Sequence, residues 1–315
     1  MFRTLSFLSI VCLLISSLNS VSAHPGGLDD NGGHLNRSTG QYHCHRDTCV
    51  TSENSNVLTP ETIRIASFNI RTFGRTKIKK ADVMAKLALI VKRFDIVAIQ
   101  EIKDVSGSTA PKFLEVINAD GSKYDFIISE RTGRQANDKT SQEQYAYFFN
   151  TKTIVTNGYD TLFDDSQNDL FQREPYIAAF KVVGGSFTFV LINIHTKPTI
   201  AVQEIESLYE AYKWSVEKYQ NEDDFIMLGD FNASCSYASD SEISNLSIST
   251  EKFKWIIPNN ADTNQSDNSE CAYDRIVISD GAKTDYADEW GVLKVGDKRV
   301  SDHHVIWASF HSSKD

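Results

Sequence analysis

The sequence has little proline, six residues in 315, and it contains no low-complexity tract. Its composition of 41% hydrophobic, 23% charged and 11% aromatic residues is that of a folded protein, which excludes a disordered or fibrous chain. Positive charge is also scarce, because 32 Lys and Arg against 42 Asp and Glu give a formal net charge of −10. The chain therefore lacks a global positive field, and a phosphate-bearing substrate must meet local cations.

A hydrophobic stretch of the roughly 20 residues that a membrane-spanning helix needs is missing. The one long apolar run covers residues 5–15, follows Arg3 and precedes the small residues Val21-Ser22-Ala23. This order is typical of a cleaved secretory signal and predicts a signal peptide over residues 1–23. We therefore expect a secreted or periplasmic protein with no stable membrane association.

Cysteine is scarce as well, with five in the chain, of which Cys12 leaves with the predicted signal peptide. Four cysteines remain, and an oxidising compartment favours their pairing. The spacing indicates two disulfides, Cys44 with Cys49 and Cys235 with Cys271.

Residues 24–60 differ from the rest because they hold four of the eight histidines and almost no apolar residues. Such a segment cannot build a core, and we expect an appendage and linker ahead of a folded domain at residues 61–315. It resembles the short His-rich YHYH-type segments of exported bacterial proteins. The secretory signal favours a disulfide-closed loop over a zinc or copper site. The candidate ligands for that metal site are His24, His34, His43, Cys44, His45 and Cys49.

From residue 63 onward, short apolar runs alternate with stretches of helical periodicity at residues 81–94 and 201–219, which predicts a layered α/β fold. The strands are too many for one doubly wound sheet. We therefore expect two packed mixed β-sheets flanked by helices. The predicted strands span residues 63–70, 94–100, 124–129, 145–150, 176–182, 187–194, 225–230, 274–279 and 303–310.

Polar side chains stand at the ends of five of these apolar strands. One such end is usually an ordinary loop start, but a strand buried on both faces has no structural use for a charged tip. Five together predict a functional site at one edge of the sheets. The residues concerned are Asn69, Glu101, His195, Asp230, Asn232, Asp302 and His303.

The residue types at these tips restrict the chemistry. Glu101, Asp230 and Asp302, with no cysteine among the tips, form an oxygen-ligand set that suits Mg²⁺ or Mn²⁺ rather than zinc. We expect phosphate as the substrate group, with Asn232 and Arg173 helping the metal to balance charge on the phosphoryl oxygens. No Gly-x-Ser-x-Gly elbow, Walker loop or dinucleotide fingerprint competes with this interpretation.

Two histidines complete the set. His195 and His303 could each pair with a carboxylate such as Glu143 or Asp274, which would fix the imidazole tautomer and raise its pKa. Hydrolysis of a phosphodiester needs a base to activate water and an acid to protonate the leaving alkoxide. The two pairs would supply one of each.

Seven motifs then follow one another along the chain: FNIRTFGRTK at 68–77, DIVAIQEIKD at 95–104, QREPYI at 172–177, INIHTKP at 192–198, LGDFNASCSYA at 228–238, CAYDRIV at 271–277 and SDHH at 301–304. Together they resemble the deoxyribonuclease I family of the endonuclease/exonuclease/phosphatase superfamily, in order, from about residue 62 to 312. The resemblance implies a four-layered α/β sandwich. It also implies metal-dependent nicking of double-stranded DNA to 5′-phosphate ends, with Mg²⁺ or Mn²⁺ and with Ca²⁺ as a second ion, and we expect a monomer.

The resemblance also implies roles for individual residues. His195 with Glu143 and His303 with Asp274 would be the acid–base pairs. The divalent metal would be surrounded by Asn69, Glu101, Asp230 and Asp302. The scissile phosphate would be held by Asn232 and Arg173, and the DNA would be contacted by Tyr273, Arg71, Arg75 and Lys103. The bond between Cys235 and Cys271 would be the family's structural disulfide.

Binding of DNA by such a chain requires only a local basic rim, whose phosphate contacts carry no sequence information. We therefore expect cleavage with little sequence specificity. The predicted rim consists of Arg71, Arg75, Lys77, Lys103, Arg131, Arg134 and Arg173.

Two departures from the family pattern bear on the substrate and on calcium. After Gly133-Arg134 a longer loop at residues 135–145 replaces the family's short one, which leaves groove preference open. Asp262 matches one calcium position, but Thr161 stands in place of an acid at the other, so we expect a weaker calcium dependence.

Two other functions stay open. The superfamily includes secreted phospholipid phosphodiesterases such as sphingomyelinases, which would show exposed hydrophobic membrane-binding loops. The basic stretch at residues 68–77 favours DNA instead. A non-enzymatic module that presents the His-rich segment on an inactive scaffold would lack a catalytic residue, and no expected residue is missing.

Overall fold

The computed structural model describes residues 33–35, 42–44, 60–133 and 142–314. Contacts along the chain divide it into two compact units, residues 1–57 and residues 58–315. In the first unit, β1 (Gly33–Leu35) pairs antiparallel with β2 (Tyr42–Cys44).

Several expectations from the sequence lie outside the described residues. These are the signal peptide at 1–23, most of the appendage at 24–60, Cys49 with its predicted bond to Cys44, and the rim residue Arg134. Among the residues that are described, no helix combines the length and the apolar character that a membrane span requires.

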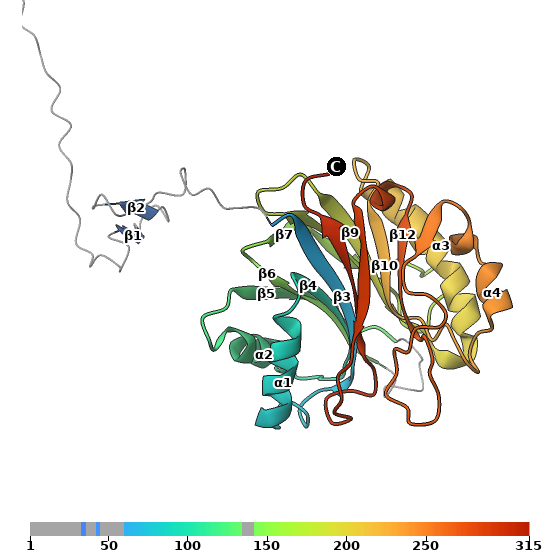
Figure 1. Ribbon diagram of the computed structural model, residues 1–315, viewed down its shortest axis with the longest axis horizontal. Coiled ribbons are helices and arrows are strands. Elements are labelled where there is room, and N and C mark those ends of the chain that lie inside the picture. Colours follow the sequence, from blue (N-terminus) through green and yellow to red (C-terminus); the bar gives the residue numbers. More distant parts are fainter. Residues whose placement is uncertain (1–32, 36–41, 45–59, 134–141, 315) are drawn as a thin grey trace, which may run out of the picture. The chain divides into compact units, whose positions relative to one another are not determined.

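Two six-stranded mixed β-sheets form the second unit (Figure 1). The first sheet has the order β13 (Tyr286–Leu293), β14 (Val305–His311), β3 (Thr62–Phe73), β4 (Ile96–Ile102), β6 (Gln144–Asn150) and β5 (Tyr124–Ile128). The second has the order β11 (Phe253–Trp255), β12 (Asp274–Ser279), β10 (Phe225–Asp230), β9 (Thr188–His195), β8 (Tyr176–Val182) and β7 (Ile154–Leu162).

Helices cover the outer face of each sheet (Figure 1). The helices α1 (Ala81–Val91) and α2 (Thr109–Asn118) pack on the first sheet, and α3 (Ala201–Lys218) packs on the second. The short helix α4 (Asp240–Ser244) adds Ile243 to the same apolar cluster as α3. Short 3₁₀ helices lie at Pro198–Ile200, Ser247–Ser249 and Gly281–Lys283.

The apolar side chains form three buried clusters, one between the two sheets and one beneath each helical layer. Both faces of the central strands are therefore covered, which explains why their sequences are almost continuously apolar. The four-layered α/β sandwich that the sequence predicted is confirmed.

Strand pairing brings chemistry-bearing residues to one edge of the second sheet. The parallel pair β9 and β10 sets Asp230 beside His195, and the antiparallel pair β10 and β12 sets Asp274 opposite Asp230. Gly229 makes this approach possible, because its φ is +145° and a Cβ there would lie 1.9 Å from the carbonyl oxygen of Ile194. The fold thus positions the site through backbone register.

A disulfide joins the loop after β10 to the loop before β12. Cys235 and Cys271 are bonded across a Cα–Cα distance of 5.8 Å and a sequence separation of 36 residues. This confirms one of the two predicted bonds. The bond holds together the two loops that flank Asp230 and Asp274.

We predict that replacing both cysteines, Cys235→Ala with Cys271→Ala, lowers the free energy of unfolding by roughly 2–4 kcal/mol, as expected for closing a loop of this length. Urea unfolding of the variant and of the oxidised wild type measures the difference. The reduced wild type serves as a control and should match the variant. An unchanged urea midpoint in both would contradict a stabilising bond.

Candidate active site

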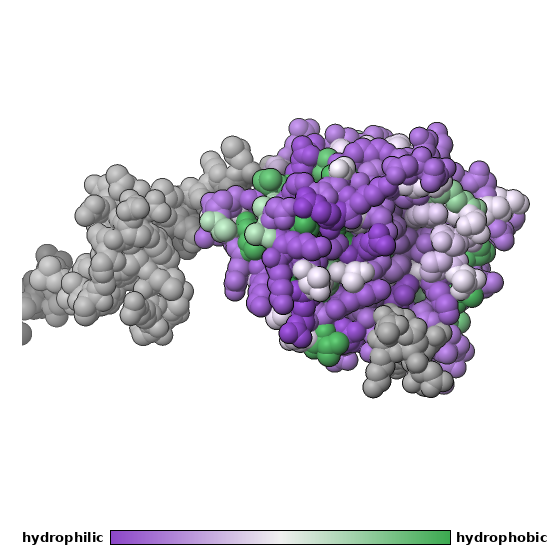
Figure 2. All heavy atoms as spheres, turned by 90° about the horizontal axis from the view of Figure 1, so that it is seen from below, coloured by the Kyte–Doolittle hydropathy of each residue, from purple (hydrophilic) through white to green (hydrophobic). Residues whose placement is uncertain are grey.

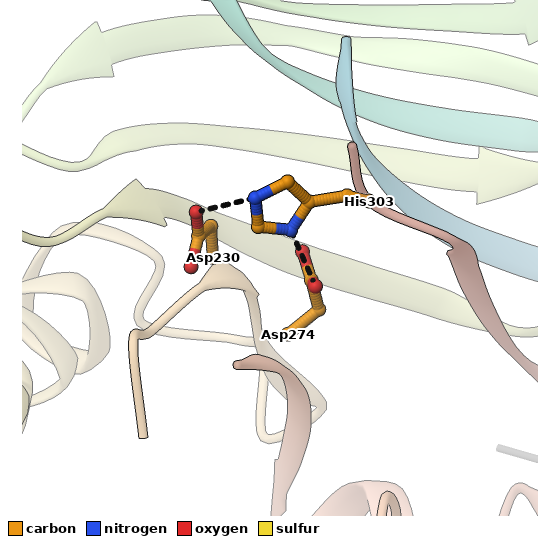
Figure 3. A group of neighbouring side chains, drawn as sticks. All are labelled: Asp230, Asp274 and His303. Atoms are coloured by element: carbon orange, nitrogen blue, oxygen red, sulfur yellow. Dashed lines mark hydrogen bonds and ion pairs between the residues drawn. The ribbon is translucent and has the colours of Figure 1, made fainter. Parts of the chain in front are cut away.

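Asp230 lies at the centre of a group of ionisable side chains at the sheet edge. Its Oδ2 is 3.5 Å from Nε2 of His195 and 3.5 Å from Nε2 of His303. The other ring nitrogen of each histidine is hydrogen-bonded to a buried carboxylate, that of His195 to Glu143 and that of His303 to Asp274, both at 2.8 Å. Figure 3 shows the second pair, with His303 between Asp274 and Asp230. The two pairs suggested by the sequence therefore lie side by side and face one shared oxygen.

Both sheets contribute to this arrangement. His195 ends β9, and Asp274 begins β12, both in the second sheet. Glu143 lies immediately before β6 in the first sheet, where it pairs with Thr132, and His303 lies just before β14. The site therefore depends on the packing of one sheet against the other.

The carboxylates change the protonation of His303. Burial alone lowers the pKa of this imidazole, but the negative charges of Asp274 and Asp230 outweigh burial and raise the pKa to about 10. Burial also raises the pKa of Asp274, although the neighbouring imidazole lowers it. The charges therefore favour an imidazolium at His303.

A second carboxylate, Glu101, lies beside Asp230. Nδ2 of Asn69 donates to both, at 3.0 Å to Asp230 and at 3.3 Å to Glu101. Burial raises the pKa of Glu101, but His195, Lys103 and the bonds it accepts lower it to about 2. Both carboxylates offer oxygen atoms, and an ionised oxygen set of this kind fits Mg²⁺ or Mn²⁺.

The two other expected metal ligands, Asn69 and Asp302, make contacts within the chain. Asn69 turns its amide nitrogen toward the carboxylates, while its Oδ1 accepts from the backbone N–H of Arg71 at 2.9 Å. Asp302 forms an ion pair with Arg71 at 3.1 Å. The side-chain amide of Asn69 therefore bridges the carboxylates of Glu101 and Asp230. Asp302 is instead paired with the exposed Arg71.

Arg173, which we expect at the scissile phosphate, is held by contacts within the chain. It is 7% exposed, and its Nε and Nη2 donate to the carbonyls of His195 and Thr196, both at 2.9 Å. Its Nε is also 3.6 Å from Glu143. These contacts turn the guanidinium toward the backbone behind His195, because two buried carbonyls there require donors.

Asn232 lies next to Asp230 with a left-handed backbone, φ 50°. Its N–H donates to Oδ1 of Asp230 at 3.1 Å, and its Nδ2 donates to the carbonyl of Thr196 at 3.1 Å. The side chain is buried beside the shared carboxylate, where its amide could reach a phosphoryl oxygen.

Of the expected DNA-contacting residues, Arg71, Lys103 and Tyr273 each interact with a residue of the predicted site. Arg71 and Arg75 are exposed, and Lys103 is half-buried with its ammonium 3.3 Å from Glu101. The ring of Tyr273 lies 6.3 Å from that of His303. Viewed from below the orientation of Figure 1, the surface is predominantly hydrophilic with scattered hydrophobic residues (Figure 2).

Lys77 has a structural role that the sequence did not reveal. Its ammonium donates to the carbonyls of Ile70 at 3.1 Å, Arg71 at 2.6 Å and Val300 at 2.7 Å. Burial lowers its pKa to about 8. Lys77 therefore fastens the end of β3 to the loop that leads to His303, and it is not part of an open basic rim. A lysine within a run of cations gives no sequence signal for this.

The predicted calcium residue is paired with a cation from the chain itself. Asp262 forms an ion pair with Lys294. In the described part of the chain, Asp262 belongs to no group of three or more potential metal ligands. These residues do not fit a calcium site at Asp262.

Comparison with known proteins gives concordant results. A family model described as the Endonuclease/Exonuclease/phosphatase family matches residues 66–303. Deoxyribonuclease-1 of Rattus norvegicus is 34% identical over 270 residues, which covers 78% of this chain and 90% of the rat protein. Deoxyribonuclease gamma of Homo sapiens is 36% identical over 223 residues, which covers 69% of this chain and 72% of the human protein.

Solved structures share the fold at low sequence identity. A humanized D. rerio TDP2 with 14 mutations has a TM-score of 0.56 at 14% identity, over 80% of this chain and 99% of that one. An endonuclease/exonuclease/phosphatase from Bacteroides vulgatus has a TM-score of 0.56 at 16% identity, over 79% of this chain and 98% of that one. These two likenesses concern the fold alone.

A third histidine next to the site has the opposite electrostatic environment. His304 is 6% exposed, and its Nδ1 accepts from the backbone N–H of Val295 at 3.2 Å. Burial and the positive charge of Lys294 lower its pKa to about 4. The folded protein therefore favours the neutral imidazole, whereas the unfolded chain protonates it below its ordinary pKa of 6.5.

We predict that His304 contributes stability that is present above about pH 6.5 and is lost as the pH falls toward 4. His304→Gln keeps an acceptor for the bonded N–H but cannot take up a proton. The difference in unfolding free energy between wild type and variant should therefore shrink from pH 7 to pH 4.5. Urea unfolding at several pH values measures it, and a difference independent of pH would refute the assignment.

Proposed function

The chain belongs to the endonuclease/exonuclease/phosphatase family, and we propose that it is an endonuclease of the deoxyribonuclease I type that hydrolyses phosphodiester bonds of double-stranded DNA. The observation that carries the proposal is the pair of histidines whose Nε2 atoms both lie 3.5 Å from one oxygen of Asp230. The named activities of the deoxyribonuclease relatives support DNA as the substrate.

The two histidines divide the proton transfers of hydrolysis between them. One removes a proton from the attacking water, and the other gives a proton to the leaving oxygen. We take the leaving oxygen to be O3′, so that the bond from phosphorus to O3′ breaks and the phosphate stays on the 5′ end. Glu143 and Asp274 each bond to Nδ1 of one ring, which leaves Nε2 of His195 and of His303 beside Asp230 and available for proton transfer.

Glu101 and Asp230 would hold Mg²⁺ or Mn²⁺, with Asp302 able to join them by releasing Arg71. When bound, the ion supplies positive charge to the phosphoryl oxygens. Asn232 would donate to one of these oxygens. Calcium is not assigned to Asp262, because Lys294 already balances its charge.

Contacts of exposed cations with the DNA backbone predict little sequence preference, and cleavage should weaken steeply with salt. The disulfide between Cys235 and Cys271 agrees with secretion into an oxidising compartment. A single chain contains both acid–base pairs, which supports action as a monomer. The hydrophilic surface in Figure 2 favours DNA over a lipid substrate.

We predict that the purified protein converts supercoiled plasmid to open circle in Mg²⁺ or Mn²⁺ and that EDTA abolishes the reaction. His195→Ala and His303→Ala should each lower the rate by at least about 10²-fold, as expected for loss of a general acid or base. Agarose electrophoresis over time measures the rate. Resealing of the nicks by DNA ligase tests for 5′-phosphate ends.

The matched control is His311→Ala, a histidine at the far end of β14 from the site, which should keep the wild-type rate. Nicking at the wild-type rate in both site variants would show that the histidines do not carry the reaction. Hydrolysis of phospholipid but not of plasmid by the wild type would instead assign the lipid substrate.

A further inference from the structure

Glu204 is a buried carboxylate beside the site that the proposed chemistry does not use. It lies in the first turn of α3 and is 1% exposed. Its Oε1 accepts from the backbone N–H of Gln172 at 2.6 Å, and its Oε2 accepts from the backbone N–H of Lys197 at 2.6 Å. A single side chain thus bridges two segments that lie 25 residues apart in the sequence.

Each bridged segment carries a residue of the site. Gln172 immediately precedes Arg173, and Lys197 follows His195 by two residues. Arg173 in turn donates to the carbonyl of His195 and to that of the next residue, both at 2.9 Å. The two segments are therefore joined by Glu204, by Arg173, and by Lys197, whose Nζ donates to Oε1 of Gln172 at 3.4 Å.

The charges of this region are arranged around the guanidinium. Burial lowers the pKa of Arg173, but Glu143 and Glu204 raise it and keep the group charged. Burial raises the pKa of Glu204, while the two amides and Arg173 lower it. The positive charge of Arg173 is therefore favoured both by Glu143, 3.6 Å from its Nε, and by Glu204.

We propose that Glu204 is a positioning residue, which fixes the spacing between the Arg173 and His195 segments and so holds the His195 imidazole against Glu143 and Asp230. Its effect on hydrolysis rests on the proposed function. Without the bridge, the buried N–H of Gln172 and the part-buried N–H of Lys197 lack an acceptor, and only the bonds of Arg173 and of the Lys197 ammonium still join the segments. A small displacement of a catalytic group lowers the rate strongly, because reaction requires close alignment.

The test compares two glutamates of one helix. Glu204→Gln keeps the shape but presents an amide nitrogen to one of the two N–H groups. Glu206→Gln is the matched control, because Glu206 is exposed on α3 and also accepts from a backbone N–H, that of Ser247, at 2.8 Å. We expect Glu204→Gln to lower kcat for nicking at least about tenfold with KM changed less than about threefold. Glu206→Gln should change neither.

Coupling to His195 separates positioning from general stability. Residues that act as a unit are not additive. In the His195→Ala background, Glu204→Gln should therefore lower the remaining rate by less than about threefold. A further full tenfold loss in the double variant would show that Glu204 acts independently of His195, and the proposal would be wrong.

Amide hydrogen exchange provides a readout that needs no substrate. Exchange at Gln172 and Lys197 should accelerate in Glu204→Gln and stay unchanged in Glu206→Gln. If the wild type fails to nick DNA while exchange changes in this way, the proposed function is wrong and the bridge is supported. If the wild type nicks DNA and Glu204→Gln keeps its kcat, the positioning role is overturned and the function stands.

Should Glu204→Gln fail to fold, Glu204→Asp takes its place. The aspartate keeps the charge but is one methylene shorter, so it can reach one N–H and not both. The same loss of kcat is expected, with the same coupling to His195. Wild-type kcat in this variant would overturn the proposal.

Discussion

The site depends on one oxygen atom. Oδ2 of Asp230 lies 3.5 Å from both imidazole Nε2 atoms and accepts from Asn69 at 3.0 Å. Asp230 can meet all of these groups because β10 lies between β9 and β12 in the second sheet, while Asn69 belongs to β3 of the first. The two sheets must therefore end at the same edge, and the buried cluster between them fixes that alignment. The packing of the core therefore determines whether the residues of the site can meet.

The chain accepts backbone strain at this edge. Thr72, Glu101 and Asn232 adopt φ values of 51°, 63° and 50°, a region that costs side chains other than glycine about 1–3 kcal/mol each. Bonds made within the site offset part of that cost. The N–H of Thr72 donates to Glu101 at 2.8 Å, and that of Asn232 donates to Asp230 at 3.1 Å. These bonds orient the carboxylates of Glu101 and Asp230. The strained backbone positions therefore lie at the predicted site.

Elements that are buried on both faces could be predicted from the sequence, whereas most strands at the edges of the sheets could not. The central strands β9, β10 and β12 are covered on both faces, and their continuous apolar runs made both the strands and their polar ends visible. The strands β7 and β13 lie at sheet edges, where Asn157-Gly158 and Asp288-Glu289 interrupt any apolar pattern, and they were not predicted. The helix α2 was not predicted either, although Pro111 in its first turn is compatible with a helix start. Residues held by long-range contacts, such as Glu204, leave no local pattern at all.

The sequence also does not show which positively charged side chains are engaged in contacts within the chain. This matters for the question of whether the site needs a metal ion. Sequence alone could not tell a rim cation from an internal one. Lys77 bonds three carbonyls, Arg173 bonds two, Arg71 pairs with Asp302, and Lys103 pairs with a site carboxylate. In a chain of net charge −10, Arg71, Lys103 and Arg173 already balance the charges of Asp302, Glu101 and Glu143. Hydrolysis of a phosphodiester still requires positive charge at the reacting oxygens. Charge balance within the described site, and not resemblance alone, therefore argues for a divalent ion at Glu101 and Asp230.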